Sequence, residues 1–199
     1  MSKGIGCAVV VVIVLVVLGL ALAGTYNNLV GLSQAVDAQW AQVESVYQRR
    51  ADLIPNLVST VQGAANFEKS TLEAVTQARA SVGQVQAPGN ITNDPAAFAK
   101  WQASQDALSG ALSRLLVVVE RYPELKADGT LRELSEELTH TENRIAFARQ
   151  AFNDSVLDYN NAAQQAPANV VAGVFGFRAA AMLQATSSDA EREVPRIKL

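Results

Sequence analysis

Residues 29–61, which read LVGLSQAVDAQWAQVESVYQRRADLIPNLVSTV, decide the fold of this chain. Their apolar side chains recur at steps of mostly three and four residues, which places one apolar stripe along an α-helix that packs against others. Arg50 stands where the stripe lacks an apolar residue, and Pro55 predicts a kink or a local break in the helix. The stripe consists of Leu29, Leu32, Val36, Trp40, Val43, Tyr47, Ile54, Leu57 and Val61.

A long apolar run precedes this helix. Between Gly4 and Gly24 there is no charged or amide side chain, and the next charge is Asp37. At about 1.5 Å per residue the run spans roughly 30 Å, the thickness of a bilayer core. A cleaved signal peptide is the alternative, but its apolar region is usually only about 7 to 15 residues long. We therefore predict that residues 1–25 form an uncleaved, single-pass membrane anchor.

Three more helical stripes follow the first one. The second is short, the third is regular apart from Gln105, and the fourth runs to about Gln165. Steps of three and four again predict amphipathic helices that bury one face. The apolar residues are Leu72, Val75 and Val82 in the second, Phe98, Trp101, Leu108, Leu112, Leu115, Val119 and Tyr122 in the third, and Leu131, Leu134, Leu138, Ile145, Ala148, Phe152, Val156 and Tyr159 in the fourth.

Turn and capping residues separate these helices. We expect turns at residues 63–67, 86–93 and 124–130, the last containing Asp128-Gly129. Asp94-Pro95 is a good helix start, because aspartate caps a helix and proline fits its first turn. Pro123 should end the third helix.

The fold class follows from these helices. No strand-like alternation occurs outside the apolar run. Helices of unequal length with short connections indicate an antiparallel up-and-down four-helix bundle with coiled-coil-type packing. The sequence thus predicts an all-α protein, with an anchor at 1–25, a bundle domain at 26–183 and a flexible tail at 184–199.

A set of polar residues lies beside the apolar stripes of the first and fourth helices. An unpaired buried charge is costly, so charged residues at the seam of a bundle usually need partners. We predict that these groups pair across helices and fix their register, while binding of a ligand or partner at the seam is the alternative. The set consists of Arg49, Arg50 and Asp52 on the first helix, and Glu142, Arg149, Asn153 and Asn160 on the fourth.

The composition gives no support for catalysis. The single cysteine, Cys7, forms no intramolecular disulfide, and the single histidine, His140, lies in a polar helical stretch that predicts a surface position. No phosphate-binding glycine motif and no cluster of metal ligands is visible. The mild net charge of −3 does not favour nucleic-acid binding. We predict no catalytic residue, no cofactor and no metal.

The segment after Pro167, ANVVAGVFGFRAAAML, is apolar but too short to span a bilayer. An up-and-down path returns it towards the anchored end of the bundle. We predict a short amphipathic element formed by Val170, Val171, Val174, Phe175 and Phe177. It should lie on the membrane surface, cover the end of the bundle, or contact a neighbouring copy.

Three long stretches carry a resemblance to a known family. YNNLVGL, RRADLIPNLVSTVQGAANFEKSTLEAVTQAR and ERYPELKADGTLRELSEELTHTENRIAFARQAFNDSVLDYN closely resemble the LemA family, over about Tyr26 to Phe177. The resemblance implies a bromodomain-like four-helix bundle behind one membrane helix, without known catalytic residues or cofactor. A relative takes part in building magnetosome membranes. The chain departs from the family at Ala166-Pro167 and at Met182-Leu183, where aromatic residues are frequent.

Several functions fit these features. We favour a membrane-anchored scaffold or interaction module of the bacterial plasma membrane, with lipid and either another copy or another membrane protein as partners. A small-molecule or envelope-stress sensor, or an accessory factor, is the alternative. A pilin-like filament subunit is disfavoured, because the apolar helix of this chain lacks the early glutamate of such subunits. The positive-inside rule applied to Lys3 places the body outside the cytoplasm. The resemblance implies the opposite, so the side stays open.

Overall fold

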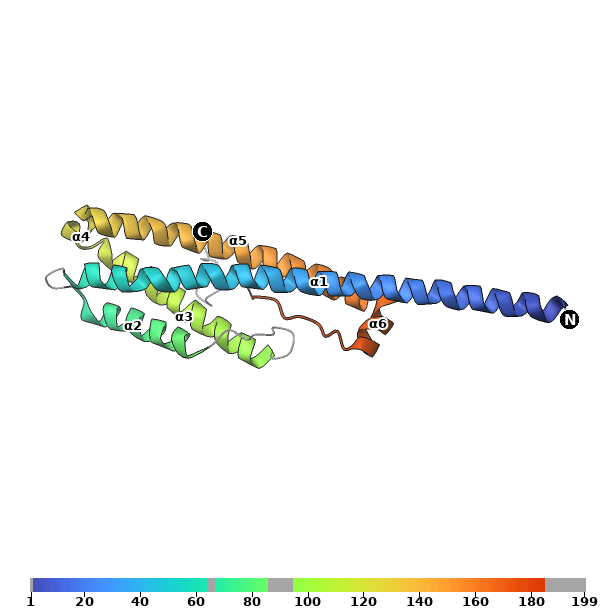
Figure 1. The fold of residues 1–199 in the computed structure, drawn as a ribbon. Helices are drawn as coiled ribbons and strands as arrows, with labels where there is room; N and C mark the ends of the chain where they lie inside the picture. Colours follow the sequence, from blue (N-terminus) through green and yellow to red (C-terminus); the bar gives the residue numbers. More distant parts are fainter. Residues whose placement is uncertain (1, 64–66, 86–94, 185–199) are drawn as a thin grey trace, which may run out of the picture.

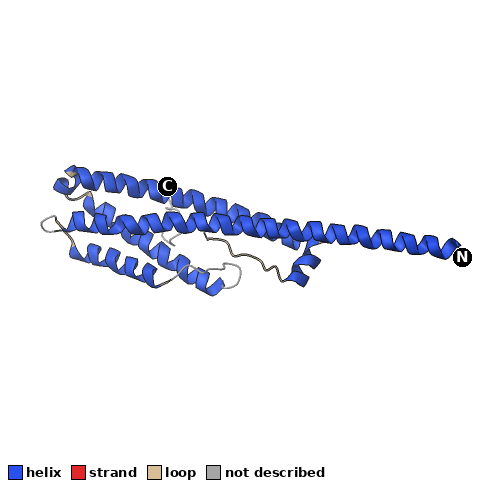
Figure 2. Ribbon diagram, viewed as in Figure 1, coloured by secondary structure: helices blue, strands red, loops and turns tan. Residues whose placement is uncertain are grey.

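The computed structural model describes residues 2–63, 67–85 and 95–184, and in these ranges the chain folds into helices joined by turns and one extended segment (Figures 1 and 2). Pairing is closest between the two longest helices, α1 and α5, and α2 packs on α3. Within the described residues there is no strand, so the predicted all-α class is confirmed. The helices are α1 (Ser2–Gln62), α2 (Lys69–Gln84), α3 (Pro95–Val119), α4 (Pro123–Ala127), α5 (Gly129–Gln164) and α6 (Ala168–Phe175).

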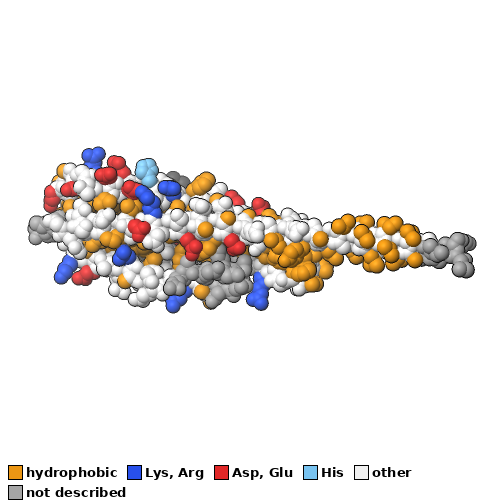
Figure 3. All heavy atoms as spheres, viewed as in Figure 1, with side chains coloured by type: hydrophobic (Ala, Val, Ile, Leu, Met, Phe, Trp, Pro, Cys, Tyr) orange, Lys and Arg blue, Asp and Glu red, His pale blue; other side chains and the backbone are white. Residues whose placement is uncertain are grey.

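Helix α1 has two parts with opposite surroundings. Its first third projects alone from the molecule, and apolar side chains cover the described part of this projection (Figure 3). Residues Val9 to Leu18 are each more than half exposed. From Leu29 onward the predicted stripe is buried, apart from the half-buried Leu32. Among the described residues, α1 alone carries a stretch long and apolar enough to cross a membrane.

The prediction of a local break at Pro55 is wrong, because α1 continues to Gln62. Proline removes one helical hydrogen bond, which leaves the carbonyl of Ala51 without its donor. Pro55 is exposed, so water can reach this side of the helix. The neighbouring Ile54 and Leu57 are buried in the core and hold the helix on its other side.

The predicted turn at 124–130 contains a short helix, α4, which the stripe pattern missed. Pro123 takes its first position, where a missing N–H costs nothing. The buried Leu125 attaches this helix to the core. Asp128 then caps α5, its carboxylate accepting a hydrogen bond of 2.8 Å from the amide of Leu131. The cap predicted at Asp94 lies outside the described residues, as do positions 86–93 and 185–199.

The core is divided into two clusters along the helices. The first cluster lies on the side of the projecting part of α1 and is rich in aromatic rings, whereas the second is almost wholly aliphatic. The first contains Val36, Trp40, Val43, Tyr47, Phe98, Trp101, Ile145, Ala148, Phe152, Val156, Tyr159, Ala180 and Leu183. The second contains Ile54, Leu57, Val61, Leu72, Val75, Leu108, Leu112, Leu115, Val119, Leu125, Leu131 and Leu138.

Candidate interaction site

A layer of polar residues separates the two core clusters. Arg50 of α1 is fully buried there, with 0% of its side chain exposed. Its Nη1 donates to Ser109 Oγ of α3 at 2.5 Å and to Glu142 Oε1 of α5 at 3.1 Å. Its Nη2 donates to the side-chain and backbone oxygens of Gln105, at 2.6 and 3.3 Å. Arg50, Gln105, Ser109 and Glu142 thus form a polar layer that joins three helices.

This polar layer fixes how the helices align. Sliding α1 by one turn against α3 or α5 would leave the guanidinium in an aliphatic core without acceptors, which is strongly unfavourable. The guanidinium also lies 4.9 Å from the ring centroid of Tyr47, a favourable cation–π arrangement. Arg50 Nε is buried without a hydrogen-bond partner. The layer therefore favours one register of α1 against α3 and α5.

Two members of the predicted polar set lie outside this layer. Arg49 points to the surface and forms an exposed ion pair with Glu137 of α5. Asp52 is also exposed and accepts a hydrogen bond of 2.8 Å from Gln48 on its own helix. Because water screens such contacts, they contribute little to stability.

The other three members hold the C-terminal segment, residues 178–184, which runs in an extended conformation beside α5. Asn160 donates to the carbonyl of Ala180 at 3.0 Å and accepts from its amide at 2.9 Å. Asn153 makes the same double contact with the backbone of Leu183, at 2.9 and 2.8 Å. Apart from the surface residues Arg49 and Asp52, the polar set divides between the polar layer and this clasp.

The clasp is completed from two other positions. Gln102 of α3 pairs with both backbone groups of Gln184, at 3.0 and 3.3 Å, and the Tyr159 hydroxyl donates to the carbonyl of Arg178 at 2.8 Å. Arg149 also donates to the Gln184 carbonyl. A side-chain amide has one donor and one acceptor and so satisfies both polar groups of one residue in an extended chain. Leu183 is buried, so this position docks although the residue is not aromatic.

Arg149 connects the clasp to the core. Its Nη1 donates to the hydroxyl of Tyr47 at 3.0 Å and forms an ion pair with Asp106 at 3.4 Å. Burial raises the pKa of Tyr47 above its usual value, although the positive charges of Arg149 and Arg50 oppose that shift. Burial also raises the pKa of Tyr159, with a smaller contribution from Asp37.

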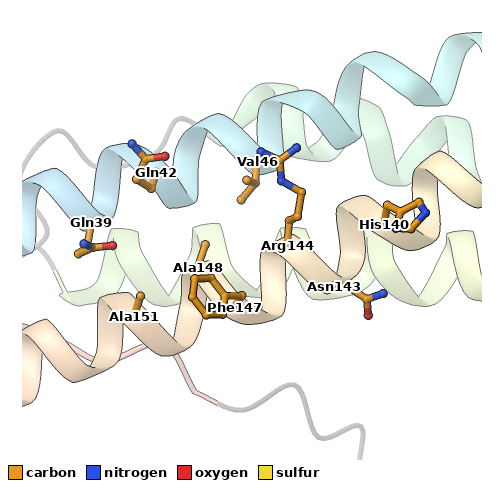
Figure 4. A pocket seen from close by; sticks show the side chains of 9 residues that line it. All are labelled: Gln39, Gln42, Val46, His140, Asn143, Arg144, Phe147, Ala148 and Ala151. Atoms are coloured by element: carbon orange, nitrogen blue, oxygen red, sulfur yellow. The ribbon is translucent and has the colours of Figure 1, made fainter.

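A pocket of about 410 Å³ lies between α1 and α5 (Figure 4). Its most exposed apolar residue is Phe147, at 75%. His140 lies at one end of this pocket and is exposed, as the sequence predicted. The described residues contain no group of three or more His, Cys, Asp or Glu able to hold a metal ion. The lining residues are Gln39, Gln42, Val46, His140, Asn143, Arg144, Phe147, Ala148 and Ala151.

The predicted C-terminal apolar element contains helix α6. Val171 and Ala172 pack with Leu29 of α1 in a third buried cluster. Val174 and Phe175 are 74% and 62% exposed, and Phe177 is half-buried. Figure 1 places α6 beside α1, at the point where α1 emerges from the other helices. This element therefore leaves apolar side chains on the surface.

Sequence reasoning missed part of both sites. Gln105 was visible as the one polar residue in the α3 stripe, just as Arg50 was in the α1 stripe, and the two pair directly. Matching these two interruptions would have found the layer. Ser109 and Gln102 carry no comparable signal, because small polar and amide residues are common on exposed helix positions.

Comparisons with known proteins identify relatives across most of the chain. Magnetosome protein MamQ of Magnetospirillum gryphiswaldense is 27% identical over 169 residues, covering 77% of this chain and 62% of the relative. MamQ 2 of Paramagnetospirillum magneticum is 27% identical over 175 residues, covering 80% and 64%. Protein LemA of Metamycoplasma hominis is 24% identical over 138 residues, covering 69% and 59%. The chain thus spans less than two thirds of the length of each of these relatives.

The family match covers both polar structures. The model of the LemA family matches residues 39–199, a range that includes the polar layer, the clasp and the segment that the clasp holds. On this match over most of its length, the chain belongs to the LemA family.

Proposed function

We propose that this chain is a single-pass protein of the bacterial plasma membrane whose body acts as a scaffold or protein-interaction module. In this proposal α1, α2, α3 and α5 form an antiparallel up-and-down four-helix bundle, and the first part of α1 spans the bilayer. The role is non-enzymatic. Membrane lipid is one partner, and either a second copy or another membrane protein is the other.

The observation that carries this proposal is the continuity of α1. One helix of 61 residues supplies both the exposed apolar part and one wall of the core. At about 1.5 Å per residue it is roughly 90 Å long. No flexible linker separates the two parts, so the body would be held at a fixed place above the membrane. A rigid attachment of this kind suits a protein that positions others.

The interior supports an interaction role over a ligand-binding role. Apart from Arg50 Nε, the polar groups that form the layer and the clasp are engaged by the chain's own helices and its C-terminal segment. Contacts with other proteins would then use the outer surface. Similarity to proteins named for the magnetosome is consistent with a role at membranes.

The exposed Phe147 offers a direct test of this proposal. A photo-crosslinking phenylalanine analogue at position 147 should give adducts of protein mass in native membranes, because exposed apolar side chains beside a pocket favour protein contacts. Leu157, an apolar residue of the same helix that is 47% exposed, is the matched control position. Mass spectrometry of the adduct separates a second copy from another membrane protein.

The pocket between α1 and α5 also favours a second candidate function, a small-molecule or envelope-stress sensor. Its amide and aromatic lining offers hydrogen bonds and an apolar surface to a small ligand. Equal yields of protein adducts at positions 147 and 157, with a small molecule crosslinked at position 147, would overturn the scaffold proposal and support the sensor.

A further inference from the structure

Helix α6 packs on α1 close to the end of the apolar run. Tyr26 of α1 contacts two aromatic rings of this region, with centroid distances of 4.8 Å to Phe175 and 5.7 Å to Phe177. One helical turn further along α1, Leu29 is fully buried against Val171 and Ala172. These contacts fix α6 along α1 between about Tyr26 and Leu29.

The opposite face of α6 is apolar and exposed. Val170 and Val174 are 62% and 74% exposed, and Phe175 remains 62% exposed although its ring contacts Tyr26. No residue of α6 is charged, and the next charge along the chain is the exposed Arg178. The α6 contacts with α1 and α5 therefore account for one side of the helix and leave the other side without a protein partner among the described residues.

The position of α6 along α1 matches the headgroup layer of a bilayer. If the hydrocarbon core ends near Gly24, Tyr26 lies about 3 Å and Leu29 about 8 Å beyond it, at roughly 1.5 Å per residue. Headgroup regions extend about 5 to 8 Å beyond each side of the core. Tyrosine is enriched at this depth, because its ring is apolar and its hydroxyl is polar.

We propose that α6 is a second membrane contact, which inserts Val170, Val174 and Phe175 into the boundary between headgroups and acyl chains. The inference rests on the membrane span proposed above. Interfacial helices bury their apolar face about 5 to 10 Å deep. Arg178 then lies within reach of lipid phosphate. With α1 crossing the bilayer and α6 lying on it, the body has two points of attachment and cannot rotate freely about the axis of α1.

Lipid quenching of a fluorescent label tests this inference on the full chain. The native cysteine is first replaced by Cys7→Ser, and single cysteines are introduced as Val174→Cys, Phe147→Cys and Leu15→Cys. Each variant is labelled with an environment-sensitive dye and placed in vesicles of phosphatidylcholine and phosphatidylglycerol that carry spin-labelled acyl chains. Positions 147 and 174 are both apolar and about three quarters exposed, so Phe147 is the matched control.

We expect the label at position 174 to lose most of its emission to the spin-labelled lipid, while the label at 147 loses none. Quenching at position 15 together with no quenching at 174 would overturn the α6 contact and leave the span intact. No quenching at position 15 would overturn the span itself, and with it this inference. A blue-shifted but unquenched label at 174 would mean that protein covers the face, which also contradicts the proposal.

Discussion

Arg50 makes the polar layer possible because of the shape of its side chain. Both terminal nitrogens of the planar guanidinium donate, Nη1 to Ser109 of α3 and Glu142 of α5 and Nη2 to Gln105 of α3. A lysine carries a single compact charge and would not reach these acceptors in the same fixed geometry. One side chain of α1 therefore sets its alignment against both α3 and α5.

We expect Arg50→Leu to lower the free energy of unfolding by about 3 kcal/mol, the lower end of the cost of breaking a buried pair. The lower end applies because Glu142 is 37% exposed, so water can solvate its carboxylate. Arg114→Leu on the exposed side of α3 is the control, at about 0 to 1 kcal/mol. Unfolding of the full chain in detergent, followed by circular dichroism, measures both. Equal midpoints would show that Arg50 contributes no more than a surface residue.

Tyr47 gives the fold an alkaline limit. Burial raises the pKa of its phenol in the folded state above the usual value of about 10. Above that pH the unfolded chain loses the proton while the folded chain keeps it, so stability present below about pH 10 is lost as the pH rises. Tyr47→Phe removes this linkage. We expect the melting temperature of the wild type to fall more steeply than that of the variant between about pH 9 and pH 11; parallel curves would contradict the shift.

At the residue scale, the sequence could identify charges that needed partners but could not assign all of the partners. Arg50 interrupts the apolar stripe, which indicated a position at the seam of the bundle, but the sequence did not identify Glu142 as its partner. Arg149, Asn153 and Asn160 share a face of α5 with Glu142, yet they lie further along it and hold residues 178–184. Helix periodicity gives the face of a residue and not the segment that packs against that face, so the docking of residues 178–184 could not be derived.

At the scale of elements, the clasp is the least regular part of the fold and the easiest to perturb. Residues 178–184 form no helix, and their backbone is held by the side chains of Gln102, Asn153, Tyr159 and Asn160. The buried Ala180 and Leu183 add apolar contacts to the first core cluster. Side-chain amides therefore form hydrogen bonds with the backbone N–H and C=O groups of this segment, as a neighbouring strand does in a β-sheet.

We expect Asn160→Ala to release the end of the segment nearest α6. Both hydrogen bonds to Ala180 are lost, each worth about 0.5 to 1.5 kcal/mol, so the amide of Ala180 should exchange with solvent roughly 10-fold faster or more. Hydrogen exchange of the full chain, read by mass spectrometry, measures this effect. Asn143→Ala, at an exposed position of the same helix, is the matched control. Exchange that is the same in both variants would mean that the asparagine does not hold the segment.

Helix positions were predictable from the sequence because long apolar stripes dominate them. The C-terminal ends of α1 and α5 fell within a residue or two of the prediction. Pro55 and α4 were misjudged for one common reason, since proline acts as a breaker only where its missing N–H matters. Pro55 lies on the exposed side of α1, where water can bond the carbonyl that lacks its N–H donor. Pro123 is the first residue of α4, where no helical N–H bond is needed. The docked segment at 178–184 has no periodicity and could not be derived.

At the scale of the whole molecule, charge and apolar surface are separated along one axis. In the view of Figure 3 the charged side chains gather over the packed helices, and the described part of the projecting helix carries none. The first charge after the apolar run is Asp37, 13 residues beyond Gly24. Such a distribution is typical of a protein that stands on a membrane, and it is the basis of the central claim that α1 is an uncleaved anchor.

Alkaline carbonate extraction of native membranes, followed by mass measurement of the intact chain, tests that claim most directly. The account predicts that the chain stays in the membrane pellet and retains residues 4–24, because a run of about 30 Å spans the hydrocarbon core. A soluble chain whose mature N-terminus is Gly24 would contradict it.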